Sequence, residues 1–261
     1  MNCLIETALL THGLRSIANE ELAQSWHCPD AILAWVDRGE LKLGPIGEYL
    51  PFRERSEELI RIDCDHLEEA LQTGASGALT ASGTMAVCRR LDIPMAITCG
   101  MGGIGDLRRE ELCPDLPALM NIPVALISTS PKDMLDRPAT LDWLRRHGVH
   151  TAGEPCTGYL FCGEPVALEL PLSSCNNEAA VRRLTANGGL LLLNPIPEKE
   201  RVQDRSILVD AIKAGKQAEA EGRYYHPAAN GEIDRRTGGY SSRIQLESIQ
   251  QNYLLAKSIM D

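Results

Sequence analysis

Three continuous apolar runs stand out along the 261-residue chain. They are Ile93 to Thr98 (IPMAIT), Ile122 to Ser128 (IPVALIS) and Gly189 to Leu193 (GLLLL). Runs of this length without polar alternation are typical of strands that are buried on both faces. The pattern therefore predicts central strands of a sheet that is covered on both sides.

Helical patterns lie between and after these runs. Ser82 to Leu91 (SGTMAVCRRL) precedes the first run, and Thr140 to His147 (TLDWLRRH) begins on a residue suited to an N-cap and stops at Gly148. A closing amphipathic helix is predicted by apolar residues at helical spacing, namely Ile249, Tyr253, Ala256 and Met260. The alternation of strands and helices predicts one layered α/β domain with a largely parallel sheet.

Composition narrows the class of protein. Hydrophobic residues make up 44% and charged residues 24% of the chain, as in ordinary soluble domains, and the net charge of −10 argues against a nucleic-acid partner. We find no apolar run long enough for a membrane span and no basic segment ahead of the first apolar residues. The nine cysteines are scattered and never in C-x-x-C spacing, which is typical of reduced thiols. We expect a cytoplasmic protein without a membrane or nucleic-acid partner.

A glycine-rich turn follows the first apolar run. Gly100, Gly102 and Gly105 in AITCGMGGIG have the G-x-G-x-x-G spacing of a dinucleotide site. Such a site needs a helix directly after the turn and an acidic residue about 20 residues further on. Two prolines, Pro114 and Pro117, interrupt the following segment, and the next apolar run ends without a carboxylate. We therefore expect backbone to pass close to a ligand or another chain segment here, and a nicotinamide-dependent oxidoreductase is the least favoured hypothesis.

Ligands of parallel α/β sheets bind beyond the carboxyl ends of the strands. Thr98, Lys132 and Asn194 follow the three apolar runs, and in a parallel sheet they would face one crevice. Lys132 is one of only six lysines. A desolvated lysine can present a free amine that attacks a carbonyl and forms a Schiff base. Its position alone leaves a surface or phosphate-binding lysine as the alternative.

Other candidate residues have two interpretations each. Glu6 lies among apolar residues as an acid or base, or as a carboxylate that caps a helix or pairs with arginine, and His12 is a structural histidine. The segment Thr80 to Thr84 (TASGT) can bind an anion at a helix N-terminus or simply cap the helix. Glu111 and Asp115 belong to an acidic segment that can ligate Mg²⁺ or Mn²⁺, or can be a solvated loop.

Six segments together resemble the pseudouridine-5'-phosphate glycosidase family, which includes the indigoidine synthase A-like proteins. The segments occur in family order over nearly the whole chain; they are IETALLTHGL, GASGALTASGTMAV, AITCGMGGIG, STSPKDMLD, NGGLLLLNPIPE and, less closely, GGYSSRIQLESIQQNYLLAKSI. The resemblance implies a single-domain α/β/α layered fold over residues 1–261 that assembles as a homotrimer. It also implies reversible cleavage of a C–C glycosidic bond to give uracil and ribose 5-phosphate.

The resemblance assigns roles to individual residues. The family's Schiff-base lysine falls on Lys132 and its acid/base glutamate on Glu6. Its metal-binding aspartate falls on Glu111, with Mn²⁺ the expected ion and Mg²⁺ the alternative. With the strand-end threonine included, substrate contacts are expected at Arg61, Ala81, Thr98, Cys113, Pro114 and Asp115.

Departures from the family pattern surround the expected substrate contacts. Arg61 stands where the family has lysine, Glu111 where it has aspartate, and either Arg243 or Gln245 where it has asparagine. We expect a Lys132-dependent C-glycosidase that acts on a C-nucleoside phosphate, or on ribose 5-phosphate plus a base. Two alternatives stay open: a C-glycoside synthase or lyase for a different base or sugar phosphate, and a non-catalytic sugar-phosphate binding protein.

Overall fold

The computed structural model describes residues 2–105, 113–155 and 157–260. The strands are β1 (Cys3–Ile5), β2 (Leu33–Asp37), β3 (Glu40–Gly44), β4 (Ile60–Ile62), β5 (Gly77–Leu79), β6 (Met95–Ile97), β7 (Gly100–Met101), β8 (Ala125–Ser128), β9 (Ser130–Pro131), β10 (His150–Gly153), β11 (Leu170–Pro171) and β12 (Leu190–Leu193). The α-helices are α1 (Asn19–Ser25), α2 (Ile46–Arg53), α3 (Leu67–Thr73), α4 (Ala81–Arg90), α5 (Asp115–Asn121), α6 (Arg137–Arg146), α7 (Glu178–Leu184), α8 (Ser206–Ala220), α9 (Tyr225–Arg236) and α10 (Tyr240–Met260). Shorter helical turns are η1 (Leu9–Gly13), η2 (Leu172–Cys175) and η3 (Glu198–Glu200).

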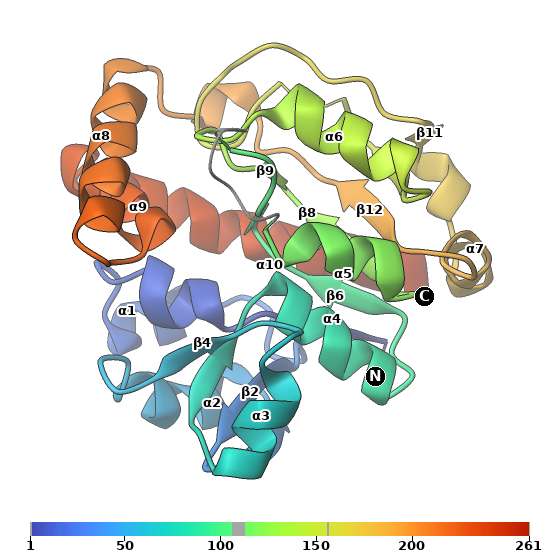
Figure 1. Ribbon diagram of the computed structural model, residues 1–261, viewed down its shortest axis with the longest axis horizontal. Coiled ribbons are helices and arrows are strands. Elements are labelled where there is room, and N and C mark those ends of the chain that lie inside the picture. Colours follow the sequence, from blue (N-terminus) through green and yellow to red (C-terminus); the bar gives the residue numbers. More distant parts are fainter. Residues whose placement is uncertain (1, 106–112, 156, 261) are drawn as a thin grey trace.

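A largely parallel sheet forms the centre of the molecule, as predicted (Figure 1). Its strand order is β11-β10-β12-β8-β6-β1-β2-β5-β4, and β3 pairs with β2. The pairings of β2 with β3 and with β5 are antiparallel. A two-residue turn joins β2 to β3, and both of its residues, Arg38 and Gly39, have positive φ, which matches the twist of a tight hairpin. Sequence periodicity did not predict this hairpin.

The three predicted apolar runs are the adjacent strands β6, β8 and β12. Their side chains alternate between two apolar layers. In β8, Ala125 and Ile127 pack into one layer and Leu126 into the other. Since all of these side chains are buried, the strands have no polar face, as the continuous runs predicted.

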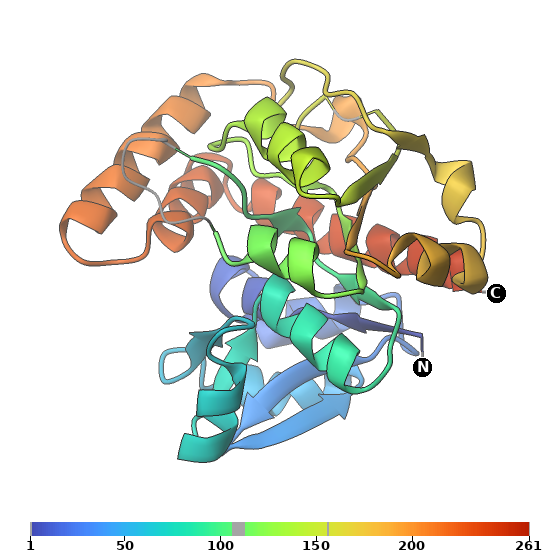
Figure 2. The ribbon, with the colours of Figure 1, turned by 45° about the vertical axis from the view of Figure 1, so that its right-hand side comes forward.

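Helices cover both faces of the sheet. The long helix α10 lies behind the sheet in Figure 1 and contacts β6, β8 and β1. Helices α4, α5 and α6 lie in front and pack against each other in sequence. Helices α8 and α9 form a pair beside these layers (Figure 2), and α9 contacts η1. The predicted α/β/α layering is therefore confirmed.

Two helix predictions need different bounds. Helix α4 lies within one residue of the predicted range, but α6 begins at Arg137 instead of Thr140. The Asp136 carboxylate caps α6 by accepting the Ala139 N–H at 2.9 Å, which is a stronger start signal than threonine. The Thr140 hydroxyl instead accepts the N–H of Ile104 at 2.9 Å. No helix within the described ranges combines the length and apolar character needed to cross a membrane.

The buried Arg53 side chain of α2 holds the segment that follows β1. Its Nε donates to the carbonyl oxygen of Leu10 at 2.6 Å, and its Nη2 donates to those of Leu14 and Ile17, each at 2.8 Å. Because these carbonyls lie in or beside η1, one guanidinium fixes the path of the chain there.

Replacing Arg53 with methionine should therefore destabilise the fold. Arg53→Met keeps much of the side-chain volume but leaves several buried carbonyls without donors, so we expect the free energy of unfolding to fall by about 3 kcal/mol or more. Urea denaturation measures the loss. In the control Arg55→Met, a partly exposed ion pair with Asp37 is removed, and the expected loss is about 1 kcal/mol or less. Equal losses in the two variants would contradict the role of Arg53.

Candidate active site

Two adjoining cavities lie where several strands end. The outer cavity has a volume of about 520 Å³ and the inner cavity about 40 Å³. Both are lined by Arg61, Thr80, Asp115, Lys132 and His226. The outer cavity is also lined by residues that include Asp63, His66, Ser82, Gly102, Cys113 and Pro114. The inner cavity is also lined by residues that include Glu6, His12, Ala81, Tyr159 and Asn230.

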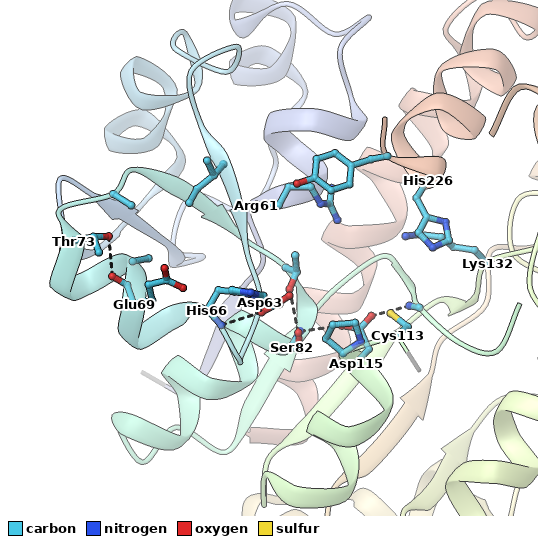
Figure 3. A pocket seen from close by; sticks show the side chains of 17 residues that line it. Arg61, Asp63, His66, Glu69, Thr73, Ser82, Cys113, Asp115, Lys132 and His226 are labelled. Atoms are coloured by element: carbon cyan, nitrogen blue, oxygen red, sulfur yellow. Dashed lines mark hydrogen bonds and ion pairs between the residues drawn. The ribbon is translucent and has the colours of Figure 1, made fainter. Parts of the chain in front are cut away.

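Lys132 enters the site through a second, small sheet. Strand β9 pairs with β7, so that Pro131 lies opposite Met101, and the Lys132 N–H donates to the Met101 carbonyl oxygen at 3.2 Å. This pairing places the lysine beside the glycine-rich turn. Its side chain is half-buried, and Figure 3 shows it next to His226.

Asp133, the residue after Lys132, holds the segment of Tyr159 in the wall of the inner cavity. The Asp133 carboxylate accepts the N–H groups of Tyr159 at 2.9 Å, Leu160 at 2.7 Å and Phe161 at 3.0 Å. Tyr159 lines the inner cavity, and its hydroxyl donates to Gln245 at 2.9 Å. Asp133 therefore couples the position of the lysine segment to that of Tyr159.

Glu6 follows β1 and its side chain is buried in the wall of the inner cavity. Burial raises the pKa of its carboxyl to about 7, while the Thr98 hydrogen bond and the positive charge of Lys132 act in the opposite direction. The Thr98 hydroxyl donates to the carboxyl at 2.8 Å. Near neutral pH both protonation states are populated, so Glu6 can give or take a proton.

Thr98 and Asn194 do not join Lys132 in the cavities. Thr98 is fully buried, donates to Glu6, and accepts at its carbonyl from Asn252 Nδ2 at 2.7 Å. Asn194 lines a separate groove beside α10. The prediction of one crevice for all three residues is therefore wrong, because β9 carries Lys132 toward β7 while the chain after β12 turns toward α10. Thr98 touches the acid instead of the cavity.

Asp115, the first residue of α5, connects the start of α4 to the glycine-rich turn at the edge of the site. Its carboxylate accepts the N–H of Ser82 at 3.1 Å and that of Gly102 at 2.7 Å. A Cβ atom on Gly102 would lie only 2.0 Å from the Cys113 sulfur, so any other residue here would force Cys113 to move. The glycine turn thus packs closely against another chain segment, and Gly102 also lines the outer cavity, so both predicted interpretations stay open.

The start of α4 forms the floor between the cavities. Thr80 caps the helix by accepting the Gly83 N–H at 3.3 Å, which favours the helix-cap interpretation of this segment. Ala81, the first residue of α4, is buried in the inner cavity wall. Arg61, from β4, reaches the same place, and no ion pair or hydrogen bond of its guanidinium is found within the described residues. The predicted substrate contacts other than Thr98 therefore meet around Lys132.

The predicted metal ligand Glu111 lies outside the described residues. Among the residues that the structure describes, no group of three His, Cys, Asp or Glu side chains could hold a metal ion. Asp115 uses both carboxylate oxygens on backbone N–H groups. The described residues therefore do not by themselves fit Mn²⁺ or Mg²⁺, and the metal stays a prediction from the sequence.

Sequence reasoning missed the contribution of α9. His226 and Asn230 lie one helical turn apart, and both line the inner cavity. Their four-residue spacing puts them on one face of a helix, which is the only signal that the sequence offers. His12, which we interpreted as structural, does bond to the Leu59 carbonyl, but it also lines the inner cavity.

Comparison with known protein families identifies the chain. Residues 4–260 match the family described as indigoidine synthase A like protein. The chain belongs to this family. Proteins named pseudouridine-5'-phosphate glycosidase from Methylobacterium nodulans and Escherichia coli are 27% and 25% identical to it over 274 and 280 residues. Each alignment covers 98% of this chain, and 81% and 88% of the respective relative.

Two solved structures have the same fold as this chain. An indigoidine synthase A-like protein from Thermotoga maritima superimposes with a TM-score of 0.82 and 22% identity, covering 98% of this chain and 91% of that one. The prealnumycin C-glycosynthase AlnA, solved in complex with ribulose 5-phosphate, gives a TM-score of 0.77 at 22% identity, with the same coverage. These comparisons confirm the predicted indigoidine synthase A-like family, the α/β fold and the expectation of an enzyme related to C-glycosidases.

The perturbed carboxyl of this indigoidine synthase A-like protein makes stability depend on pH. The Glu6 pKa rises from 4.5 to about 7 on folding, so stability is lost as the pH rises through that interval. In Glu6→Gln the amide cannot ionise but still accepts the Thr98 hydrogen bond. We expect its free energy of unfolding at pH 8 to exceed that of the wild type by about 2 kcal/mol, with no gain near pH 4.5.

Urea denaturation at pH 4.5 and pH 8 measures this difference. The matched control is Glu219→Gln on the exposed face of α8, whose effect on stability should be small. A stability difference for Glu6→Gln that is the same at both pH values would contradict the buried-acid interpretation.

Proposed function

We propose that this enzyme reversibly cleaves the C–C glycosidic bond of pseudouridine 5'-phosphate, or of a related C-nucleoside phosphate, to the free base and ribose 5-phosphate. The observation that supports the proposal best is the meeting of the buried Glu6 carboxyl and the Lys132 amine at one pair of cavities. The relatives' shared name, pseudouridine-5'-phosphate glycosidase, agrees with it.

The two cavities suggest how the substrate lies. Arg61 offers a guanidinium that can bind a phosphate through two N–H groups, and it also lines the wide outer cavity. The overall charge of −10 makes such local cations the chief attraction for an anion. Glu6 lines the inner cavity, so we place the 5'-phosphate outward, C1' of the ribose at Lys132, and the base toward Glu6.

The first chemical step opens the sugar ring. A carbon-linked base is not released by protonating a ring heteroatom, because the bond to be broken joins two carbons. Glu6 instead donates its proton to the ribose ring oxygen while electrons from the base release the C1'–oxygen bond. The amine of Lys132 then adds to C1', which forms a C–N bond and sheds one proton from nitrogen.

The second step breaks the C–C bond. A proton is delivered to the base carbon that carries C1', and Glu6, reprotonated, is positioned to deliver it. The lone pair of the Lys132 nitrogen forms a C=N bond with C1', and the electrons of the C–C bond return to the base ring. Water hydrolyses the resulting imine to ribose 5-phosphate and the free lysine. One water is consumed overall, and synthesis follows the reverse order.

Three further features of the proposal are predicted from the sequence alone. We propose a Mn²⁺ or Mg²⁺ requirement and a homotrimer from the family pattern described above, and a cytoplasmic location from the scattered cysteines of the sequence. Metal dependence of the rate, the mass of the assembly in solution and cell fractionation test these features separately from the chemistry.

Loss of the lysine amine should abolish cleavage. We expect wild-type protein to release uracil from pseudouridine 5'-phosphate, and Lys132→Ala to be slower by at least about 1,000-fold. Chromatography of the released base measures the rate. The control Lys216→Ala removes an exposed amine of α8 and should leave the rate unchanged. Borohydride with ribose 5-phosphate should add the mass of the sugar phosphate at Lys132. An unmodified Lys132, or release that survives in Lys132→Ala, would refute the proposed function.

The pH profile should report Glu6. Ring opening needs the protonated carboxyl, whose pKa is about 7, so kcat/KM for cleavage should fall about tenfold per pH unit above that value. In Glu6→Gln the rate should drop by about 100-fold or more, and this alkaline limb should disappear. Initial rates from pH 5.5 to 9 give the profile. If the same limb persists in Glu6→Gln, another group is the acid.

A further inference from the structure

Three of the residues that line the inner cavity carry buried polar atoms without hydrogen-bond partners in the described part of the chain. They are His12 Nδ1, His226 Nδ1 and Asn230 Oδ1. The side chains of His12 and Asn230 are more than nine-tenths buried. A buried polar atom without a partner costs about 1–3 kcal/mol, so three around one small cavity point to a ligand that completes them.

The tautomer of His12 is fixed by the fold. Its Nε2 lies 3.0 Å from the carbonyl oxygen of Leu59 and must donate to it, so Nδ1 of the neutral ring carries a lone pair. Burial lowers the pKa of His12, and the nearby charges of Arg61 and Arg15 act in the same direction. In the wall of the cavity His12 Nδ1 is therefore a buried hydrogen-bond acceptor without a partner among the described residues, and its natural partner is an N–H or O–H group.

The other two groups come from α9. His226 and Asn230 lie one turn apart on the helix that packs against η1, the turn that carries His12. Burial and the charges of Lys132 and Arg61 lower the pKa of His226, which stays neutral. Together the three side chains form a neutral wall able to accept and donate hydrogen bonds, next to Glu6 and Lys132.

The position and size of this wall select one part of the substrate. The inner cavity holds about three waters, which is enough for the edge of a six-membered ring but not for a nucleotide. It lies on the Glu6 side of Lys132, whereas the wide cavity on the other side suits the sugar phosphate. In an N-nucleoside one ring nitrogen of the base is bonded to C1' and has no hydrogen. In a C-nucleoside the base is bonded through carbon, so this nitrogen keeps its N–H.

We propose that His12, His226 and Asn230 form the recognition site for the base, and that His12 selects a heterocycle with a ring N–H directed at its Nδ1. This inference rests on the proposed function, because it takes Lys132 as the group that binds C1'. The wall distinguishes C-nucleosides from N-nucleosides, and bases with a free ring N–H from those without one.

The test runs the reaction in the direction of synthesis, with ribose 5-phosphate and uracil. In His12→Gln the side-chain amide can still donate to the Leu59 carbonyl, but the Nδ1 acceptor is lost. We expect the KM for uracil to rise about tenfold and the KM for ribose 5-phosphate to stay unchanged. Asn230→Leu should act in the same direction and serves as a second variant should His12→Gln fail to fold. The control His147→Gln, on the exposed end of α6, should change neither constant.

Methylated bases sharpen the result. The bases 1-methyluracil and 3-methyluracil each lack one ring N–H. We expect the wild-type enzyme to use the one that lacks the N–H directed at His12 at least about tenfold less efficiently than uracil. His12→Gln should lose most of that discrimination. A variant that merely perturbs the fold would change both KM values and keep the preference.

The possible outcomes test the base-recognition site and the proposed function separately. Borohydride trapping of Lys132 by ribose 5-phosphate needs no base. If trapping persists in the variants while the KM for uracil and the preference among bases stay as in the wild type, the recognition site is refuted and the proposed function stands. If wild-type protein is neither trapped nor active, the proposed function is refuted and the recognition site falls with it.

Discussion

Strands β12, β8, β6 and β1 are parallel and bury both faces, and this constraint determines where the rest of the molecule can carry polar chemistry. With α10 on one side and α4, α5 and α6 on the other, neither face of these strands is free for a ligand. Polar groups gather instead beyond the strand ends. Glu6 follows β1 directly, and Lys132 follows the short strand that continues from β8.

The loops at this edge depend on buried carboxylates. Asp115 joins the start of α4 to the glycine turn, and Asp133 joins the lysine segment to the segment of Tyr159. Both are satisfied by backbone N–H groups, so each acts as a fixed anchor. Glu6 differs because one hydroxyl and a nearby amine do not compensate for its burial. An acid held in this way costs stability, which is common where a fold supports reactive groups.

Much of this arrangement could be predicted from the sequence, and the remainder has a physical explanation. Continuous apolar runs identified β6, β8 and β12, and their ends pointed to Lys132. Family resemblance added Glu6. The direction of the Thr98 side chain depends on the register of β6 with β1, which no local pattern encodes. The position of α9 beside the inner cavity depends on its tertiary packing against η1. His226 and Asn230 were therefore not predicted as site residues from the sequence.

The closing helix has a consequence for how the protein matures during synthesis. Asn252 of α10 donates to the carbonyl of Thr98, and Thr98 in turn holds Glu6. Because Asn252 lies far beyond Glu6 along the chain, the Glu6 carboxyl acquires its final surroundings only after α10 has been synthesised and has docked. Contacts this distant along the chain form slowly, and until then the back of the sheet exposes an apolar surface prone to association. Nascent chains of this protein therefore have a long interval in which they benefit from a chaperone.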